Sequence, residues 1–445
     1  MSGDSRDQTD AVVNIVFIQE DRRGFRFADP VQVIVAMRTS EVVPALHDVE
    51  TAVTQHHRYA AGFISYEAAA AYDLAVREPT PDLPLLWFGL YAQAEPINDW
   101  LSLMSNGSGP DSYTVGPWQP AISRADYERA VWHVKDYLAR GHSYQVNYTF
   151  PLGGVEQLPV EEQLDGARLS AKPVKGTAPR GRTLAEDEAY ITGLRHSEKN
   201  RAENLMIVDM IRNDMGRVAQ VGSVAVPRLL EVERYPTLLQ MTSTVTAWTQ
   251  VSVAKILERM FPCASITGAP KVRTMQIIRE LEPYPRGVYT GAIGLISPNR
   301  QARFSVAIRT VLVDQEQRRA SYGVGSGLVW DSDAACEYEE CLLKARVLTT
   351  QRPSFQLLEA LLWEPDGGYF LLAEHLARLV DTAIYFNVPL DRIAIEACLA
   401  DRALTLNAAS KIRLRVNPDG VFALEAEPLV QGTFPQLIRV GLARE

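Results

Sequence analysis

Pro173-Val174-Lys175-Gly176-Thr177 stands near the middle of the chain and continues into Ala178-Pro179-Arg180-Gly181. The lysine lies between a proline, which stiffens the backbone, and a glycine, which lets another group approach the backbone closely. Partial burial would lower the pKa of such an amine toward neutral pH, and the neutral amine is a nucleophile. A solvated lysine in a surface turn is the alternative, and the local sequence alone favours it.

Length and composition predict a soluble globular protein of about three domains, or of one large and one smaller domain. The chain has 445 residues, of which 47% are hydrophobic and 22% are charged. No apolar run is long enough to span a bilayer, and the polar start MSGDSRDQTD does not resemble a secretory signal. The four cysteines form no CxxC pair, and the net charge is −9. We therefore expect a cytoplasmic protein that binds neither nucleic acid nor a membrane.

Hydrophobic periodicity predicts alternating strands and helices. Helices are expected at 68–71, 124–140, 196–217, 254–260, 271–281, 337–348 and 374–385. Strands are expected at 144–150, 218–226, 291–297, 302–313, 320–329, 355–363 and 369–372, and a hairpin at 411–416 and 421–427. A domain boundary is expected at Gln351-Arg352-Pro353-Ser354, after which the pattern restarts.

Two of the predicted helices carry carboxylates spaced to share one face. Glu203 follows Asn200 at i+3, and Glu340 follows Glu337 at i+3, with Lys344 one turn further on. Two such helices facing each other would form an oxygen-rich pocket that suits Mg²⁺. Solvated helix faces are the alternative, because glutamate on a helix is usually exposed.

Three further elements are typical of anion binding. The stretch 263–271 leads small residues into a helix N-terminus, which attracts anions. Arg309, at the end of an apolar strand, is either paired structurally or binds a carboxylate through two hydrogen bonds. The stretch Gly323-Val324-Gly325-Ser326-Gly327 marks either a bulge or a place where a ligand touches the strand backbone. Together with Lys175 and the carboxylates, they predict a pocket for a small, oxygenated polyanion beside a divalent ion.

Five motifs resemble those of the chorismate-utilising enzymes, and they stand in the same order. They are Tyr144-Gln145-Val146-Asn147, Pro173 to Thr177, Arg201 to Asp209 with Arg212-Asn213-Asp214, Ser265 to Lys271, and Gly325-Ser326-Gly327 followed by Glu337 and Glu340. Residues 10–349 resemble aminodeoxychorismate synthase component I within this family, which also includes anthranilate, isochorismate and salicylate synthases. Lys175 favours the resemblance to aminodeoxychorismate synthases over that to anthranilate synthases, which carry a small residue at this position.

The resemblance implies an α+β fold in which outer helices cover a large antiparallel-sheet sandwich, as in anthranilate synthase. Residues 1–115 would form its N-terminal part and residues 116–349 its chorismate-binding catalytic core. Lys175 would attack C2 of chorismate and expel the C4 hydroxyl, and ammonia would then add at C4 and displace the lysine. The family's Mg²⁺ ligands match Glu203, Glu337 and Glu340, and its substrate-binding positions match Thr267, Tyr289, Arg309, Gly325 and Lys344.

The implied product is 4-amino-4-deoxychorismate, which leads to p-aminobenzoate and folate. Ammonia would come from a separate glutamine amidotransferase subunit, since no Cys-centred amidotransferase domain is recognised in the chain. The alternatives are component I of anthranilate synthase and a catalytically impaired chorismate-binding protein.

The impaired alternative is based on departures from the family pattern. The chain between Phe150 and Lys175 is short, and Leu158 to Glu162 does not match the Ser-Pro-Glu segment that supplies a general acid. A missing strand there would leave sheet edges unpaired. Asn200 also stands where the family has an acidic residue.

Residues 354–445 resemble the N-terminal part of 4-amino-4-deoxychorismate lyase, a pyridoxal-phosphate enzyme of aminotransferase class IV. The resemblance is carried by 355–363 and by Glu374-His375-Leu376-Ala377-Arg378-Leu379, in which Arg378 matches a cofactor phosphate ligand. No lysine follows Lys411 to form the Schiff base. We therefore expect this partial α+β domain to be inactive by itself, with pyridoxal phosphate bound only in a complete lyase domain.

Overall fold

The computed structural model describes residues 16–20, 23–97, 118–152, 160–235, 238–314, 317, 319–345 and 355–429. Contacts divide the chain into two compact units. The first comprises Met1–Gly176, Ser197–Glu231 and Met241–Thr350, and the second comprises Thr177–His196, Val232–Gln240 and Gln351–Glu445. The predicted boundary at 351–354 lies outside the described residues, next to the division after Thr350.

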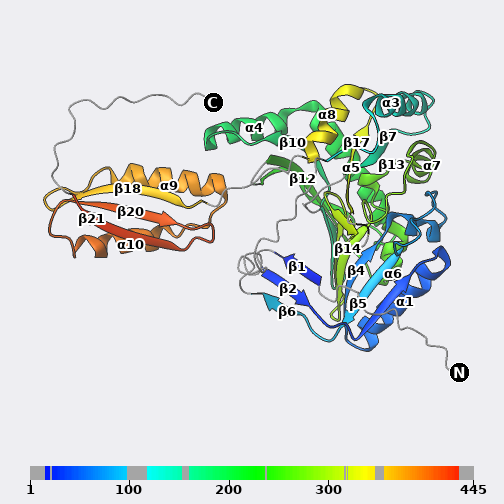
Figure 1. Cartoon of the computed structure of the whole chain (residues 1–445), viewed down its shortest axis with the longest axis horizontal. Helices are drawn as coiled ribbons and strands as arrows, with labels where there is room; N and C mark the ends of the chain where they lie inside the picture. The colour runs from blue at the N-terminus through cyan, green and yellow to red at the C-terminus, as the bar shows by residue number, and fades with distance from the viewer. Residues whose placement is uncertain are drawn as a thin grey trace. The chain divides into compact units, whose positions relative to one another are not determined.

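A ten-stranded sheet dominates the fold (Figure 1). Its order is β10-β12-β9-β8-β15-β14-β4-β5-β3, and β11 also pairs with β12. The strands are β3 (Gln32–Ala36), β4 (Tyr59–Ile64), β5 (Leu86–Tyr91), β8 (Val160–Asp165), β9 (Arg168–Ala171), β10 (Val174–Pro179), β11 (Ala225–Arg234), β12 (Leu238–Trp248), β14 (Ala292–Ser297) and β15 (Gln301–Val306).

Two smaller sheets complete the first unit. One has the order β13-β7-β17-β16, from β13 (Gly268–Ala269), β7 (Gln145–Leu152), β17 (Arg319–Leu328) and β16 (Val311–Asp314). The other contains β1 (Val16–Glu20), β2 (Arg23–Phe27) and β6 (Glu95–Ile97). The antiparallel pairing of β7 with β17, and of β15 with β8 and β14, confirms the predicted α+β fold with antiparallel sheets.

Helices cover the sheets of the first unit on two sides. Helices α1 (Thr39–Gln55) and α6 (Val253–Met260) share one core with the large sheet, and Figure 1 shows them beside β4 and β5. Helices α3 (Arg124–Ala139) and α8 (Ala334–Ala345) pack on β7 and β17 in a second core. The remaining helices are η1 (Tyr66–Tyr72), α5 (Glu198–Gly216), η2 (Ala264–Ile266) and α7 (Lys271–Leu281). None of the helices in the described ranges combines the length and the apolar character needed to cross a membrane.

Side-chain alternation along β17 gives the strand one face that packs in the core and one that carries glycine. Tyr322, Val324 and Leu328 are buried in the core with α3 and α8. The intervening Gly323, Gly325 and Gly327 lie on the opposite face, since successive residues of a strand point to opposite sides. This glycine face of β17 lets groups of neighbouring residues lie directly against the strand backbone.

Several predicted elements differ from the observed ones. The predicted strand 302–313 is interrupted after Val306 because Arg309 adopts a left-handed conformation with φ of 51°. The strand expected at 218–226 begins only at Ala225, and the Ala-rich helix at 68–71 is the 3₁₀ helix η1. The expected gap in the sheet near residue 160 is absent from the described residues, because β8 pairs with both β15 and β9.

The second unit contains a four-stranded sheet of order β19-β18-β20-β21. Its elements are α4 (Leu184–His196), β18 (Leu357–Glu364), β19 (Gly368–Tyr369), α9 (Leu372–Phe386), α10 (Arg392–Ala403), β20 (Ser410–Val416) and β21 (Phe422–Pro428). The predicted hairpin is therefore confirmed. Arg180 donates to the carbonyl of Tyr385 and pairs with the fully buried Asp187, so the 177–196 segment is held within this unit. The match of the unit to a lyase domain stays a prediction.

A buried ion pair lies between the sheets of the first unit. Arg286 and Glu282 are joined by a 2.7 Å contact, and their side chains are 2% and 4% exposed. The Arg286 guanidinium lies 4.6 Å from the ring centroid of Tyr66. Glu67 accepts hydrogen bonds from the backbone N–H of Arg286 and of Gly287, at 2.7 and 2.9 Å. Burial nevertheless raises the pKa of Glu67 to about 7.

The close packing of β4 against β5 gives a first prediction. A Cβ at Gly62 would lie 2.0 Å from the carbonyl oxygen of Trp87, which is part of the backbone of β5. We expect Gly62→Ala to lower the free energy of unfolding by about 1–3 kcal/mol in urea titrations, since the backbone must shift. Gly193→Ala in α4, where nothing lies within 4 Å of the added Cβ, is the control and should not destabilise the protein. Equal losses in both variants would contradict the packing argument.

The buried Glu67 gives a second prediction. Because its pKa is raised from 4.5 to about 7, the folded protein retains a proton that the unfolded chain releases between these values. Its contribution to stability is therefore present below the ordinary pKa and is lost as pH rises through about 7. We expect Glu67→Gln to flatten the fall in unfolding free energy between about pH 5 and pH 8, measured by urea titration at several pH values. An unchanged slope would show that Glu67 does not titrate in this range.

Candidate active site

Three side chains converge on the glycine face of β17. A Cβ at Gly327 would lie 2.7 Å from Nε2 of Gln145, 3.1 Å from Oδ1 of Asn147 and 3.2 Å from Nζ of Lys175. Only glycine lets the strand approach these groups so closely. The site therefore begins where β7, β10 and β17 come together.

The backbone of Lys175 is held by a buried asparagine. Nδ2 of Asn204, a fully buried residue of α5, donates to the Lys175 carbonyl at 3.1 Å. Ser243 in turn donates to Oδ1 of Asn204 at 2.6 Å, which fixes the orientation of the amide. Gly176 has φ of 101°, a conformation that favours glycine. The lysine is therefore a positioned residue, and only 25% of its side chain is exposed.

Glu203 links two lysines. Its Oε2 lies 3.3 Å from Nζ of Lys175, and its Oε1 lies 4.0 Å from Nζ of Lys199, one turn earlier on α5. The helix places Lys199 and Glu203 on one face because they are four residues apart. Asn200, where the resemblance leads us to expect an acidic residue, donates from Nδ2 to the Ser197 hydroxyl at 3.0 Å.

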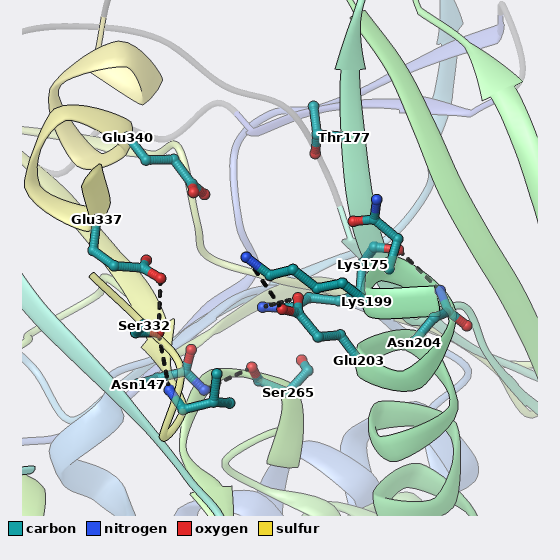
Figure 2. A network of polar contacts seen from close by, with 12 residues as sticks. Asn147, Lys175, Thr177, Lys199, Glu203, Asn204, Ser265, Ser332, Glu337 and Glu340 are labelled. Atoms are coloured by element: carbon teal, nitrogen blue, oxygen red, sulfur yellow. Dashed lines mark hydrogen bonds and ion pairs between the residues drawn. The ribbon is translucent and has the colours of Figure 1, made fainter. Parts of the chain in front are cut away.

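Helix α8 contributes two carboxylates from the opposite side. Figure 2 shows Glu337 and Glu340 pointing from α8 toward the side of the site where Lys175, Lys199 and Glu203 lie. Burial tends to raise the pKa of Glu340, but Lys344, Lys175 and Lys199 outweigh it and lower that pKa below its ordinary value. Glu203 and Glu340 therefore share the same lysine neighbours.

The carboxylates do not form a ready three-ligand cage. Among the residues that the structure describes, no three His, Cys, Asp or Glu side chains gather as a metal site would. Glu337 instead accepts a 2.8 Å hydrogen bond from the Ser332 hydroxyl. Glu203 and Glu340 still suit Mg²⁺ by donor chemistry, since this ion takes few carboxylates and keeps oxygens of water or substrate. The assignment of metal ligands stays a prediction.

Lys344 lies against the backbone of Gly325. Its Nζ donates to the Gly325 carbonyl at 2.9 Å and pairs with Glu340 at 2.9 Å. The Tyr322 hydroxyl donates to the Lys344 carbonyl at 3.3 Å. Burial raises the pKa of Tyr322 to about 12, and the charge of Arg309 opposes this rise. The roles of Arg309, Gly325 and Lys344 in substrate binding stay predictions.

Tyr289 and Thr267 contact the walls in different ways. The ring of Tyr289 packs on Gly323, where an added Cβ would lie 2.1 Å from the ring. Thr267 is fully buried, and its hydroxyl lies 3.3 Å from the Ala264 carbonyl, within its own turn. Its carbonyl accepts the backbone N–H of Asn147 at 2.8 Å. In the structure, the backbone of Thr267 therefore pairs with Asn147 of β7. Its role as a substrate ligand stays a prediction.

Sequence reasoning named Gln145 within a motif but gave it no role, and it did not single out Lys199. Gln145 is 1% exposed, and within the described part of the chain its Oε1 is buried without a hydrogen-bond partner. Its place two residues before Asn147 on β7 puts both side chains on one face. The signal for Lys199 was its spacing of four residues before Glu203.

Arg378, the predicted cofactor ligand, lies in the second unit within a polar cluster. Its Nε donates to Oε1 of Glu359 at 2.9 Å, and His375 contacts Oε2 of the same carboxylate at 2.7 Å. Burial tends to raise the pKa of Glu359, but hydrogen bonds from Arg378 and His375 lower it. The Arg378 side chain is 64% exposed, and its role toward a cofactor stays a prediction.

Comparisons with known proteins agree with this geometry. Residues 162–350 match the sequence model of a family described as chorismate binding enzyme. Aminodeoxychorismate synthase component 1 of Escherichia coli (strain K12) is 35% identical over 287 residues, which are 57% of this chain and 63% of that protein. The probable chloroplastic aminodeoxychorismate synthase of Oryza sativa subsp. japonica is 48% identical over 185 residues, which are 41% of this chain and 20% of that protein. The chain thus spans less than two thirds of the length of either relative.

Solved structures share the fold. Anthranilate synthase component I from Streptococcus pneumoniae TIGR4 superposes with a TM-score of 0.60 at 22% identity, covering 79% of this chain and 95% of that one. At this identity the likeness establishes the fold alone. The sequence matches make residues 162–350 similar to the chorismate binding enzymes, and much of the chain similar to the aminodeoxychorismate synthases.

Proposed function

We propose that this chain converts chorismate and ammonia into 4-amino-4-deoxychorismate. The observation that carries the proposal is Lys175, a positioned and mostly buried amine that lies 3.3 Å from Glu203 and faces the glycine strand β17. The relatives named aminodeoxychorismate synthase support the same reaction. The lysine also argues against the anthranilate synthase alternative.

The reaction needs Lys175 to become neutral before it attacks. Glu203, whose Oε2 lies 3.3 Å from Nζ, favours the charged amine, so loss of this contact when Glu203 binds the metal would favour the neutral amine. The Nζ–C2 bond then forms while both ring double bonds shift by one position and the C4–O bond breaks, and the hydroxyl leaves as water with a proton from a general acid. Ammonia next forms the N–C4 bond, both double bonds shift back, the Nζ–C2 bond breaks, and the new ammonium group carries the added proton.

The cations Arg309 and Lys344 suit a substrate with two carboxylates. Lys344 donates to the Gly325 carbonyl, and Arg309 would hold a substrate carboxylate through two hydrogen bonds. Glu203 and Glu340 would hold Mg²⁺, which when bound would balance the charge of a substrate carboxylate and assist the departure of hydroxide. Placing the ion requires Glu203 to exchange its contact with Lys175 for the metal.

Ammonia would come from a partner subunit. The names of two relatives, which end in component 1, support a separate component. We propose that this partner is a glutamine amidotransferase, that the product serves p-aminobenzoate and folate synthesis, and that the protein acts in the cytoplasm. The general acid is not assigned, since the side chains of 153–162 lie outside the described residues.

Replacing Lys175 is the direct test. We expect Lys175→Ala to lower kcat for aminodeoxychorismate by at least about 10³-fold with ammonium salts as donor, because the covalent route is lost. Product is followed by mass spectrometry, and an adduct on the parent protein should map to Lys175. The control is Lys255→Ala, which removes an amine paired with Glu258 on α6. Full activity in Lys175→Ala would exclude the lysine mechanism, and chorismate binding without turnover in the parent would favour the impaired alternative.

A matched pair of glutamates on α8 tests the metal. We expect Glu340→Gln to weaken Mg²⁺ binding about tenfold or more in calorimetric titrations with saturating chorismate, since one carboxylate ligand is lost. Glu339→Gln is the control, because Glu339 is the neighbouring residue on α8 and pairs with Arg124 of α3. Chelation of the metal should abolish turnover, and added Mg²⁺ should restore it. Equal Mg²⁺ affinity in both variants would remove Glu340 from the ligand set.

A further inference from the structure

The buried Arg286 contacts three separate wall segments of the site. Its Nη2 donates to the Asn147 carbonyl at 2.8 Å, and its Nη1 donates to the Ile266 carbonyl at 2.9 Å. Nη1 also lies 3.3 Å from the hydroxyl of Thr290. These acceptors belong to β7, to η2 and to the turn before β14, which are far apart in the sequence.

Glu282 extends the same network to a fourth point. It holds Arg286 through Nε at 2.9 Å and through Nη2 at 2.7 Å. Its Oε1 also accepts the backbone N–H of Thr149 at 2.8 Å and the Thr149 hydroxyl at 3.0 Å. The Arg286–Glu282 pair therefore forms hydrogen bonds with β7 at two alternate residues, Asn147 and Thr149.

Each attachment point adjoins a residue of the proposed site. Asn147 converges on Gly327, and Thr149 is the cross-strand partner of Gly325. Ile266 directly precedes Thr267, and Thr290 directly follows Tyr289. A single ion pair thus fixes the spacing between the walls that would bind chorismate.

The energetics favour a positioning role over a stabilising one. A buried ion pair recovers little more than the cost of removing its charges from water, so its presence is weak evidence for stability. The planar guanidinium offers five fixed donors, a pattern that a lysine ammonium cannot reproduce. Tyr66 covers one face of the Arg286 guanidinium, and Glu67 accepts a hydrogen bond from the Arg286 backbone. The guanidinium therefore has little freedom to rotate.

We infer that Arg286 and Glu282 are positioning residues that set the separation of the active-site walls. The inference rests on the proposed function for its catalytic readout, while the mechanical coupling can be measured without it. Neither residue is assigned a contact with the reacting atoms.

Two variants and one control test the inference. Arg286→Lys keeps the positive charge and removes the planar set of guanidinium donors. Thr149→Val removes the hydrogen bond from the Thr149 hydroxyl to Glu282. Thr249→Val is the matched control, because Thr249 is fully buried and donates one hydrogen bond to the Val218 carbonyl in another region. Steady-state kinetics, chorismate affinity on a Lys175→Ala background, melting temperature and amide hydrogen exchange are measured for each.

We expect kcat/KM for chorismate to fall about a hundredfold in Arg286→Lys and about tenfold in Thr149→Val, with Thr249→Val near the parent. Exchange of backbone amide hydrogens should be faster in Arg286→Lys and in Thr149→Val at residues 266–268 and 289–291. Lower melting temperatures with unchanged kcat/KM and unchanged exchange in these two segments would overturn the positioning role.

Failure of the proposed function gives a different result. If the parent binds chorismate without forming product, the variants must weaken chorismate binding by the same factors for the inference to hold. If the parent binds no chorismate, the exchange data decide. Faster exchange at the two wall segments in Thr149→Val, but not in Thr249→Val, supports the inference, and equal exchange in the two overturns it.

Discussion

The absence of side chains at positions 323, 325 and 327 is the constraint on which the site depends. It lets the Tyr289 ring pack on one glycine and Lys175 approach another. The alternate residues of β17 are large and anchor the strand to α3 and α8. One strand thus contributes to the core on one face and lets site residues approach its backbone on the other.

Much of the fold follows from local pattern. The amphipathic spacing of α3 and α7 and the hairpin of β20 and β21 were predicted nearly to their ends. The end of the strand before Arg309 was not predicted, because hydrophobic periodicity does not indicate a left-handed residue inside an apolar run. Helix α1 was also not predicted, and it carries Pro44, a residue that usually breaks a helical pattern.

The site was less predictable than the fold. Motif resemblance placed Lys175, Glu203 and Glu340 in one region, and their shared lysine neighbours agree with that placement. Resemblance did not show that Glu203 already pairs with Lys175, nor that Thr267 turns its hydroxyl into its own turn. Such details depend on contacts between segments that are distant in the sequence. Local sequence patterns carry no information about these contacts.

The two compact units alternate along the chain, which crosses between them five times. Residues 177–196 belong with the C-terminal portion, where Tyr385 receives Arg180. A single cut at the apparent border after residue 350 would therefore not yield two intact pieces. The C-terminal portion is interwoven with the rest of the polypeptide, and gain or loss of this portion by simple gene fusion would require the 177–196 segment to adapt at the same time.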